Sequence, residues 1–147
     1  MIEKDVFLVQ ADTTVGFLSK DHEKLSHIKG RSNTKKTLEV VSDLKTLSKY
    51  TRVPNSFKNK VRRAKRTTFI YPNGKAFRVV DKNSCHNILL KRYGKFYSTS
   101  ANYTGKSFEY NFAFENCDIS IENKDGFNET IPSKIYKINN LSIRRIR

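Results

Sequence analysis

The stretch KFYSTSANYTG, residues 95–105, is the part of the sequence that decides the fold, because it places small polar side chains after a predicted strand. Residues 95–99 are predicted to form this strand, and hydroxyl and amide side chains follow up to Asn102, with Gly105 shortly after. Such groups at the end of a strand form anion or sugar sites in α/β folds. A Ser/Thr-rich turn is the common alternative, and this stretch alone leaves both interpretations open.

Two widespread catalytic motifs are missing from the sequence. It contains no GxxxxGK[ST] phosphate-binding loop and no GxSxG nucleophile elbow. The sequence therefore supports neither a P-loop nucleotide-binding protein nor a serine hydrolase.

On either side of this stretch, strands are mixed with short helices. Further strands are predicted at residues 6–11, 37–41, 67–71, 75–80, 112–121 and 133–138, with 141–146 as another candidate. Helices are predicted at residues 21–28, 43–50, 55–64 and 83–93, where Asp21 is a plausible N-cap and Gly94 a fitting C-terminal residue. This mixture predicts a single α/β (α+β) domain, residues 1–147, with a twisted mixed sheet.

The chain is strongly basic. Its 147 residues include 29 Lys and Arg against 14 Asp and Glu, which gives a net charge of +15. A field of this sign attracts polyanions such as nucleic acids, nucleotides and acidic lipids. A genome biased towards Lys, Asn and Ile can produce the same composition, so the charge alone does not establish a function.

The sequence shows no membrane or secretory signature. No apolar run approaches the ~20 residues of a membrane helix, and the N-terminus lacks a basic start and an apolar stretch. Two cysteines, Cys85 and Cys117, do not make a disulfide framework or a metal site. We therefore expect a cytoplasmic protein without a membrane partner.

A basic loop follows the first predicted helix. Lys29, Arg31 and Lys35 lie on it, and Gly30 gives the backbone freedom. Such a loop can clamp a triphosphate, with Lys as a point charge and Arg as a fork. A solvated charge run at the C-terminus of a helix is the alternative.

A second basic stretch, KVRRAKR, spans residues 60–66 and contains five cations. Its arginines and lysines could contact an RNA backbone; the RNA-binding candidates are Arg62, Arg63, Lys65 and Arg66. The end of an ordinary surface helix is an equally good interpretation. The sequence contains no RNP1 motif and no zinc-finger spacing.

Other candidate ligands carry little information. Asp12 follows the first predicted strand and could hold Mg²⁺ or a substrate amine, although a turn-forming aspartate is more common. His22 and His27 are five residues apart and do not form a pair on one helix face, and His86 stands alone.

Taken together and in order, these segments resemble the YrdC family, the threonylcarbamoyl-AMP synthases. TSANYTG at residues 99–105 is nearly the family's Thr-Ser-Ala-Asn-x-Ser-Gly, and Lys-Gly-Arg at 29–31 is similar to its Lys-x-Arg signature. Weaker similarities are Asp12-Thr13-x-x-Gly16, Arg78, Pro132-Ser133 and the closing basic pair Arg144-Arg145. The resemblance covers nearly the whole chain.

The resemblance implies an activity and partners. Family members use ATP, L-threonine and bicarbonate, with Mg²⁺, to make threonylcarbamoyl-AMP and pyrophosphate. The tRNA-threonylcarbamoyl transferase machinery then passes the group to an adenosine of tRNA. The implied fold is a twisted mixed sheet around a large, open, basic cavity.

The resemblance also implies the residues of the nucleotide site. ATP would be bound by Lys29, Arg31, Lys35, Ser100, Asn102 and Arg145. Lys29 and Arg31 are the catalytic candidates, because positioning and charge neutralisation carry the rate when an acyl adenylate forms. Mg²⁺ is expected to enter with ATP.

The implied threonine site lies on other segments of the chain. Its residues would be Asp12, Thr13, Arg78, Ser98 and Ser133. Arg78 would pair with the carboxylate of the amino acid, for which a guanidinium is the expected bidentate partner.

The sequence departs from the family pattern at the threonine side. Gln10-Ala11 stands where the family has Pro-Thr, which removes a threonine-contacting hydroxyl, and Val15 stands where the family has Tyr. Two alternatives therefore stay open. One is a YrdC-fold protein that binds double-stranded RNA or tRNA without synthase activity. The other is an ATP-dependent carbamoyl- or acyl-adenylate enzyme with a different acceptor.

Overall fold

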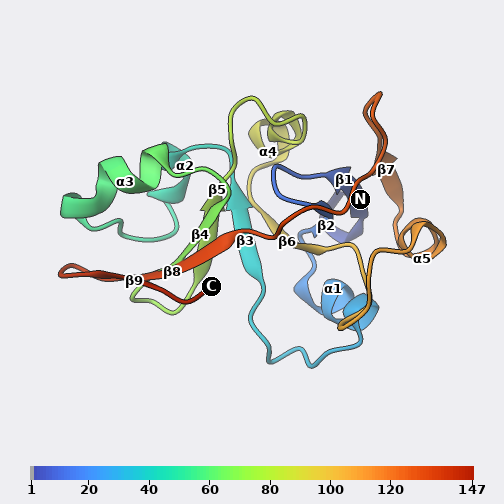
Figure 1. The fold of residues 1–147 in the computed structure, drawn as a ribbon, viewed down its shortest axis with the longest axis horizontal. Helices are drawn as coiled ribbons and strands as arrows, with labels where there is room; N and C mark the ends of the chain where they lie inside the picture. The colour runs from blue at the N-terminus through green and yellow to red at the C-terminus, as the bar shows by residue number, and fades with distance from the viewer. Residues whose placement is uncertain (1) are drawn as a thin grey trace.

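The structure of the protein is a computed structural model that describes residues 2–147, and within them nine strands form one sheet (Figure 1). The strands are β1 (Val6–Gln10), β2 (Val15–Ser19), β3 (Leu38–Val41), β4 (Thr67–Ile70), β5 (Ala76–Val79), β6 (Phe96–Ser100), β7 (Ile119–Ile121), β8 (Lys134–Ile138) and β9 (Ile143–Arg145). Their order across the sheet is β7-β1-β2-β6-β3-β5-β4-β8-β9. The pairs β1/β7, β3/β5 and β4/β8 are parallel and the others antiparallel, so the predicted mixed α/β sheet is confirmed.

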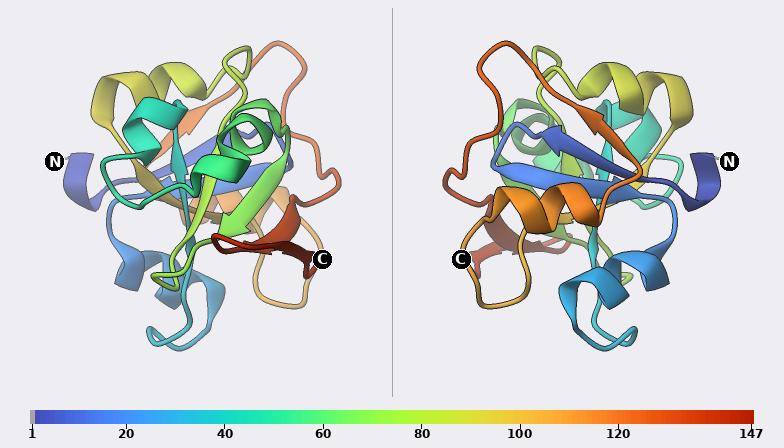
Figure 2. Two further views of the ribbon diagram at one scale, coloured as in Figure 1. Left: turned by 90° about the vertical axis from the view of Figure 1, so that its left-hand side faces the viewer. Right: turned by 90° about the vertical axis from the view of Figure 1, so that its right-hand side faces the viewer.

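Helices cover the sheet on both faces (Figure 2). The helices are α1 (His22–Lys29), α2 (Leu44–Leu47), α3 (Lys58–Arg63), α4 (Asn87–Tyr93) and α5 (Tyr110–Glu115), with 3₁₀ turns η1 (Ile2–Lys4) and η2 (Asn55–Phe57). Side chains of β1 point alternately to the two faces. Val6 and Leu8 pack in the core with α1 and α5, whereas Phe7 and Val9 pack with α4. A third cluster joins β4, β5 and β8 to α2 and α3.

Helix α1 ends where the predicted basic loop begins. The Asp21 side chain accepts a hydrogen bond from the Lys24 N–H at 3.1 Å, which confirms the predicted N-cap. Gly30 closes the helix with φ of 68°, a left-handed conformation that favours glycine. Lys29 is therefore fixed as the last helical residue, and Arg31 follows on the turn.

The strand prediction for residues 112–121 is wrong over its first half. Residues 112–121 were predicted to form one strand, but Tyr110–Glu115 is helix α5 and only Ile119–Ile121 is a strand. On the helix, Tyr110 and Phe114 are neighbours at i, i+4 and stack with ring centroids 4.6 Å apart. The buried side chain of Ala113 fixes this helix against the core.

Two further boundaries differ from the prediction. Strand β2 was not predicted; it follows a tight turn after Asp12 that is closed by the Ala11 N–H donating to Thr14 O at 3.3 Å. Helix α4 begins at Asn87, not after Asn83, because Asp81 accepts the Asn83 N–H and holds those residues in a turn.

Within residues 2–147, no helix combines the length and the apolar character needed to cross a membrane.

Candidate functional site

A cavity of about 560 Å³ opens on one side of the sheet, between the loop after α1 and the last residues of the chain. Its basic lining residues are Lys29, Arg31, Lys35, Lys36, Arg78 and Arg147. Hydroxyl groups line much of the rest, and no Asp or Glu is among the lining residues. The cavity therefore carries an uncompensated positive charge that favours an anionic ligand.

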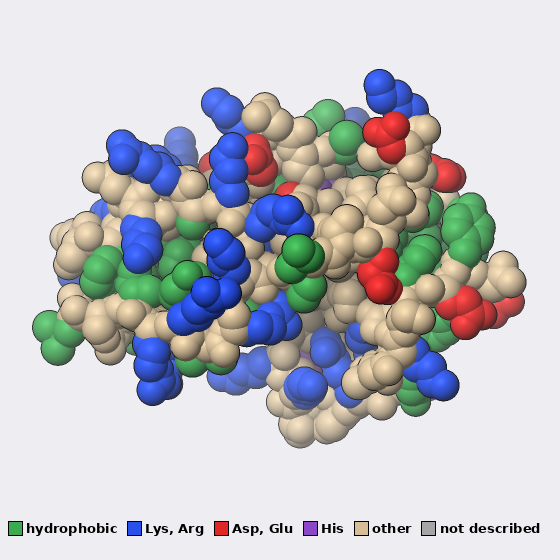
Figure 3. Space-filling view, in the orientation of Figure 1, with side chains coloured by type: hydrophobic (Ala, Val, Ile, Leu, Met, Phe, Trp, Pro, Cys, Tyr) green, Lys and Arg blue, Asp and Glu red, His purple; other side chains and the backbone are tan. Residues whose placement is uncertain are grey.

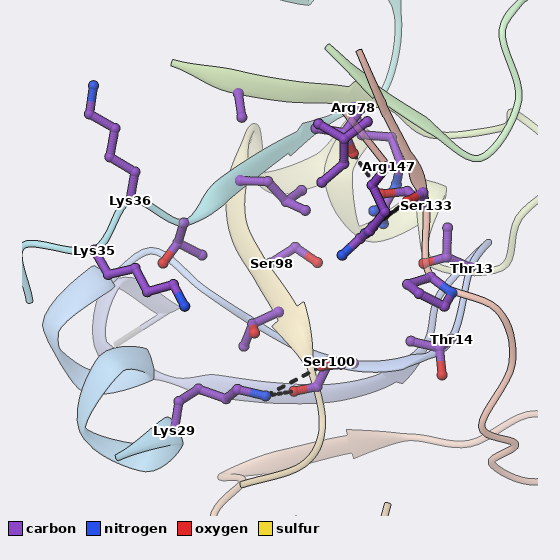
Figure 4. Close-up of a pocket in the computed structure, with 18 of the residues that line it drawn as sticks. Thr13, Thr14, Lys29, Lys35, Lys36, Arg78, Ser98, Ser100, Ser133 and Arg147 are labelled. Carbon is purple, nitrogen blue, oxygen red and sulfur yellow. Dashed lines mark hydrogen bonds between the residues drawn. The ribbon is translucent and has the colours of Figure 1, made fainter. Parts of the chain in front are cut away.

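The cationic side chains gather at two ends of this cavity. Lys29, Lys35 and Lys36 lie on one side, and Arg78 and Arg147 lie on the other (Figure 4). Ser98, in the middle of β6, lies between the two groups (Figure 4). A ligand that fills the cavity would meet positive charge at both ends.

Lys29 is the centre of the first end, which we call the lysine end (Lys29, Arg31, Lys35 and Lys36). It is only 4% exposed. Its Nζ donates to Ser100 O at 3.0 Å, to Ser100 Oγ at 3.3 Å and to Asn102 Oδ1 at 3.0 Å. All three acceptors are neutral. Burial, reinforced by the charges of Arg31 and Lys35, lowers the pKa of Lys29 to about 8.

The segment Ser100–Asn102 is held so that it can present these acceptors. The Ala101 N–H donates to Val15 O at 3.0 Å, and Asn102 Nδ2 donates to Lys106 O at 2.6 Å. A Cβ at Gly16 would come within 2.9 Å of Thr99 O, so glycine is required where β2 passes β6. These contacts explain why the glycine and the Thr-Ser-Ala-Asn segment occur together. They also direct Asn102 toward Lys29.

Arg31 and the lysines complete this end. The Nη2 of Arg31 donates to Thr37 Oγ1 at 2.7 Å, while its buried Nε makes no hydrogen bond. Burial lowers the pKa of Arg31 from its ordinary value, and the group stays charged. Lys36 Nζ donates to Gly74 O at 3.2 Å, which links the loop to the β4–β5 hairpin.

The second end, which we call the arginine end (Arg78 and Arg147), is built differently. Arg78 on β5 is 3% exposed, and its Nη2 lies 3.2 Å from Asp12 Oδ1 in a buried ion pair. Burial lowers the pKa of Arg78, and the carboxylate of Asp12 opposes that shift. The Nε of Arg78 has no hydrogen-bond partner. Arg78 therefore lines the cavity as a buried guanidinium whose charge Asp12 balances.

His86 belongs to the same buried group. Its Nδ1 lies 2.7 Å from Ser84 Oγ, and its Nε2 makes no hydrogen bond. Burial lowers the pKa of His86 to about 4. The positive charge of Arg78 adds to this lowering, and the carboxylate of Asp12 opposes it. His86 is therefore neutral at pH 7 and leaves the Asp12–Arg78 pair as the only charges in this group.

Arg147 reaches the cavity through a bulge at the end of β9. Both Ile146 N–H and Arg147 N–H donate to Ile135 O, at 2.8 and 3.1 Å. Two residues after β9 therefore lie opposite one residue of β8, which is the pattern of a β-bulge. The guanidinium of Arg147 donates to Ser133 O through Nη2 at 2.7 Å. Ser133 Oγ in turn lies 2.8 Å from Thr68 Oγ1.

Most of the residues predicted for the site come together in this cavity. The predicted residues that line it are Thr13, Lys29, Arg31, Lys35, Arg78, Ser98, Ser100, Asn102 and Ser133. Asp12 lies behind the lining, against Arg78. Arg145, predicted to close on the nucleotide, is exposed on β9 and does not line the cavity.

The predicted RNA-binding residues lie elsewhere. Arg62 and Arg63 are exposed at the end of α3, and Lys65 and Arg66 are exposed on the turn that follows. None of the four lines the cavity. They belong to a separate basic surface.

Sequence reasoning missed several cavity residues. Arg147, Lys36, Thr37 and Thr68 line the cavity but were not singled out. Thr37 opens a predicted strand, and Thr68 lies in the hairpin that carries Arg78, so both could have been included. No pattern in the sequence predicts the bulge that directs Arg147 into the cavity.

The cavity does not fit a resident magnesium ion. No carboxylate lines it, and within residues 2–147 no three His, Cys, Asp or Glu side chains gather as metal ligands. Ser100 and Asn102 offer oxygens, but these already accept from Lys29. An ion here would be bound mainly by its ligand's phosphates.

Comparisons with solved structures identify the type of fold. No family model and no curated protein matches the sequence. Among solved structures, E. coli YciO is similar with a TM-score of 0.76 at 17% identity, over 98% of this chain and 82% of that one. P. abyssi Sua5, solved with L-threonine, is similar with a TM-score of 0.74 at 16% identity, over 97% of this chain and 50% of that one. The chain has the YrdC-like fold.

The same fold occurs inside longer proteins. T. kodakarensis HypF has a TM-score of 0.75 at 14% identity, over 98% of this chain and 22% of that one. The chain thus spans about half of Sua5 and less than a quarter of HypF. At these identities the similarity establishes a shared fold.

Proposed function

We propose that this protein is an L-threonylcarbamoyl-AMP synthase, which forms threonylcarbamoyl-AMP and pyrophosphate from ATP, L-threonine and bicarbonate. The observation that carries the proposal is the cavity with cations at both ends and no lining carboxylate. ATP is anionic at its triphosphate, and an amino acid is anionic at its carboxylate. A volume of about 560 Å³ is in the range of cofactor and ligand sites.

The lysine end is proposed to bind the triphosphate. The three acceptors of Lys29 Nζ are neutral, so no anion neutralises its charge, and a bound phosphate would replace one of these hydrogen bonds. Arg31 keeps a free Nε and can add a directed hydrogen bond. In the proposed reaction, the carbamate of threonine attacks the α-phosphorus and pyrophosphate leaves. Lys29 and Arg31 would stabilise the charge that develops on the phosphates.

The arginine end is proposed to bind the carboxylate of threonine. Arg78 would donate through its unpartnered Nε, and Arg147 adds a second guanidinium beside Ser133. Sua5, which shares the fold, was solved with L-threonine, and this supports an amino-acid site. Mg²⁺ is proposed to enter bound to ATP.

Pyrophosphate release tests this proposal. The purified protein is given ATP, Mg²⁺ and bicarbonate, with and without L-threonine. We expect release that requires both threonine and bicarbonate, and that is lost in Lys29→Met but retained in Arg145→Met. The proposal fails if threonine does not stimulate release in a preparation that binds ATP.

A different acceptor is the second candidate for the same chemistry. Ala11 lines the cavity where the family pattern has a threonine hydroxyl, so the acceptor side offers one polar contact fewer. The same assay with a panel of amino acids distinguishes the two. Release that is faster with another amino acid than with threonine would favour this candidate.

RNA binding is a further candidate, carried by the exposed basic surface at Arg62, Arg63, Lys65 and Arg66. Backbone binding to double-stranded RNA or tRNA would weaken steeply with salt. Filter binding of Arg62→Ala/Arg63→Ala at two salt concentrations tests it, because a true contact would reduce both affinity and salt dependence.

A further inference from the structure

The acidic residues of this basic protein are concentrated in one segment. Residues 107–131 contain six of the 14 acidic residues and one of the 29 basic residues, a net charge of −5 in a chain of +15. All six acidic side chains belong to exposed residues. In the space-filling view, red and green side chains gather over α5 and β7, and most blue ones lie elsewhere (Figure 3).

Exposed apolar side chains accompany this charge. On α5, Tyr110 is 49% and Phe114 is 38% exposed, and their rings stack. Phe127 packs edge-on against Phe114, with centroids 6.5 Å apart. On β7, Ile119 and Ile121 are 39% and 40% exposed. In the register Phe7↔Ile119 and Val9↔Ile121, the two isoleucines lie on the face of the sheet that α4 covers, whereas α5 lies on the opposite face. Exposed apolar side chains therefore border the β7 edge on both faces, and apolar surface rimmed by charge is typical of a protein-interaction site.

Strand β7 is also an open edge of the sheet. Within residues 2–147 it pairs with β1 alone. Because the Ala11 N–H bonds to Thr14 O, the odd residues of β1 bond to β2 and the even ones bond to β7. In the register Leu8↔Ser120, the backbone of Ser120 is therefore directed away from β1, to the open side.

The other edge of the same sheet is protected. Strand β9 carries Arg144 and Arg145, and charged residues on an edge strand discourage pairing with another chain. Strand β7 carries isoleucine, serine and isoleucine, with no Lys, Arg or Pro. The two edges therefore differ in the feature that controls strand addition.

We propose that the β7 edge, together with the exposed rings of α5, binds an extended, positively charged segment of another protein, which adds to the sheet as a strand next to β7. Strand addition draws its affinity from main-chain hydrogen bonds and its specificity from alternate side chains. Here one set of alternate side chains would meet Ile119 and Ile121 on the α4 face, and the other set would lie on the face of α5. Lysines or arginines of the segment would face the acidic rim.

Charge selects this occupant over the others. Asp118 is paired with Lys24 of α1 at 2.9 Å, but the other five acidic residues of the segment still outnumber its one lysine, so a second copy that paired edge to edge would bring two acidic surfaces together. Nucleic acids and anionic membranes would be repelled by the same rim. A basic segment of a partner is attracted by this rim, and the acidic charge of residues 107–131 would steer its association with the β7 edge.

Peptide binding tests the proposal on the whole chain. The probes are fluorescein-labelled peptides of alternating valine and lysine, of alternating valine and glutamate, and of the first composition with its valines and lysines grouped. Anisotropy measures the affinity, and ¹⁵N chemical-shift changes locate the site. We expect the alternating basic peptide to bind at least tenfold more tightly than the other two and to shift the amides of residues 119–121.

Two variants localise the effect. Ser120→Pro removes the outward N–H without removing a bond to β1, and it should weaken binding at least tenfold, whereas Ser120→Ala should not. Ile121→Lys gives β7 the edge charge that β9 already has, and it should also abolish binding. This variant provides the test if Ser120→Pro does not fold. The proposal is overturned if the basic peptide does not bind, if it shifts other residues, or if both folded variants bind it like the wild type.

Discussion

The two ends of the cavity hold buried cations in different ways. At the lysine end, Lys29 is surrounded by neutral oxygens of Ser100 and Asn102, so its charge has no counterion. At the arginine end, Arg78 is paired with Asp12 at 3.2 Å. The difference indicates that the lysine end is completed only by an anionic ligand. At the arginine end, the charge of Arg78 is balanced before any ligand arrives, whereas the guanidinium of Arg147 donates only to the neutral Ser133 O.

The largest expected effect comes from breaking the balanced end. Asp12→Asn leaves the guanidinium of Arg78 buried without a counterion, and removing one partner of such a pair costs about 3–5 kcal/mol. Urea unfolding of the variant measures this loss. The double variant Asp12→Asn/Arg78→Met should recover most of the stability, because no unpaired charge remains. A single variant as stable as the wild type would contradict the structural role of the pair.

The lysine end should respond in the opposite sense. Lys29→Met removes a buried cation without a counterion, so the free energy of unfolding should stay the same or rise. ATP affinity should fall by about 1.5–3 kcal/mol, the value of a hydrogen bond to a charged group. Calorimetric titration measures it, and Lys36→Met at the exposed rim serves as a control with a smaller loss. Equal losses in the two variants would show that only general charge matters.

A smaller effect separates two arginines near the C-terminus. Arg147→Met removes a guanidinium from the cavity, and we expect about a tenfold rise in the KM for threonine, in line with one charged hydrogen bond. Arg145→Met is the matched control, since Arg145 lies two residues away on the exposed strand. An effect at Arg145 and none at Arg147 would contradict the placement of the C-terminal bulge.

The smallest expected effect is a pH dependence at the lysine end. Burial lowers the pKa of Lys29 to about 8, so the folded protein holds fewer protons there than the unfolded chain between about pH 8 and 10.5. The contribution of Lys29 to stability therefore rises with pH in that range. ATP affinity should fall about fivefold from pH 8 to 9, because binding needs the protonated amine. Lys29→Met should remove both dependences.

Local signals in the sequence were enough to predict the lysine end. The N-cap at Asp21 and the glycine after Lys29 delimit helix α1, and the structure brings Lys29 and Arg31 to the same cavity as Ser100 and Asn102. The roles of these residues as ligands of ATP stay predictions. The mixed sheet and the β4–β5 hairpin were also predictable, since each strand carries its own apolar pattern.

The remaining features depend on long-range contacts. Residues 112–115 of helix α5 were predicted as part of a strand, whereas packing of Ala113 in the core and stacking of Tyr110 on Phe114 favour the helix. The bulge that turns Arg147 inward depends on its pairing with Ile135. Asp12 was expected to contact a ligand, but its partner Arg78 is far away in sequence.

A crystal structure of the protein with bound ATP tests the central claim most directly. We predict the triphosphate within hydrogen-bond distance of Lys29 Nζ and Arg31, with Arg78 still paired to Asp12. A triphosphate bound to Arg78 and Arg147, or outside the cavity, would contradict the assignment of the two ends.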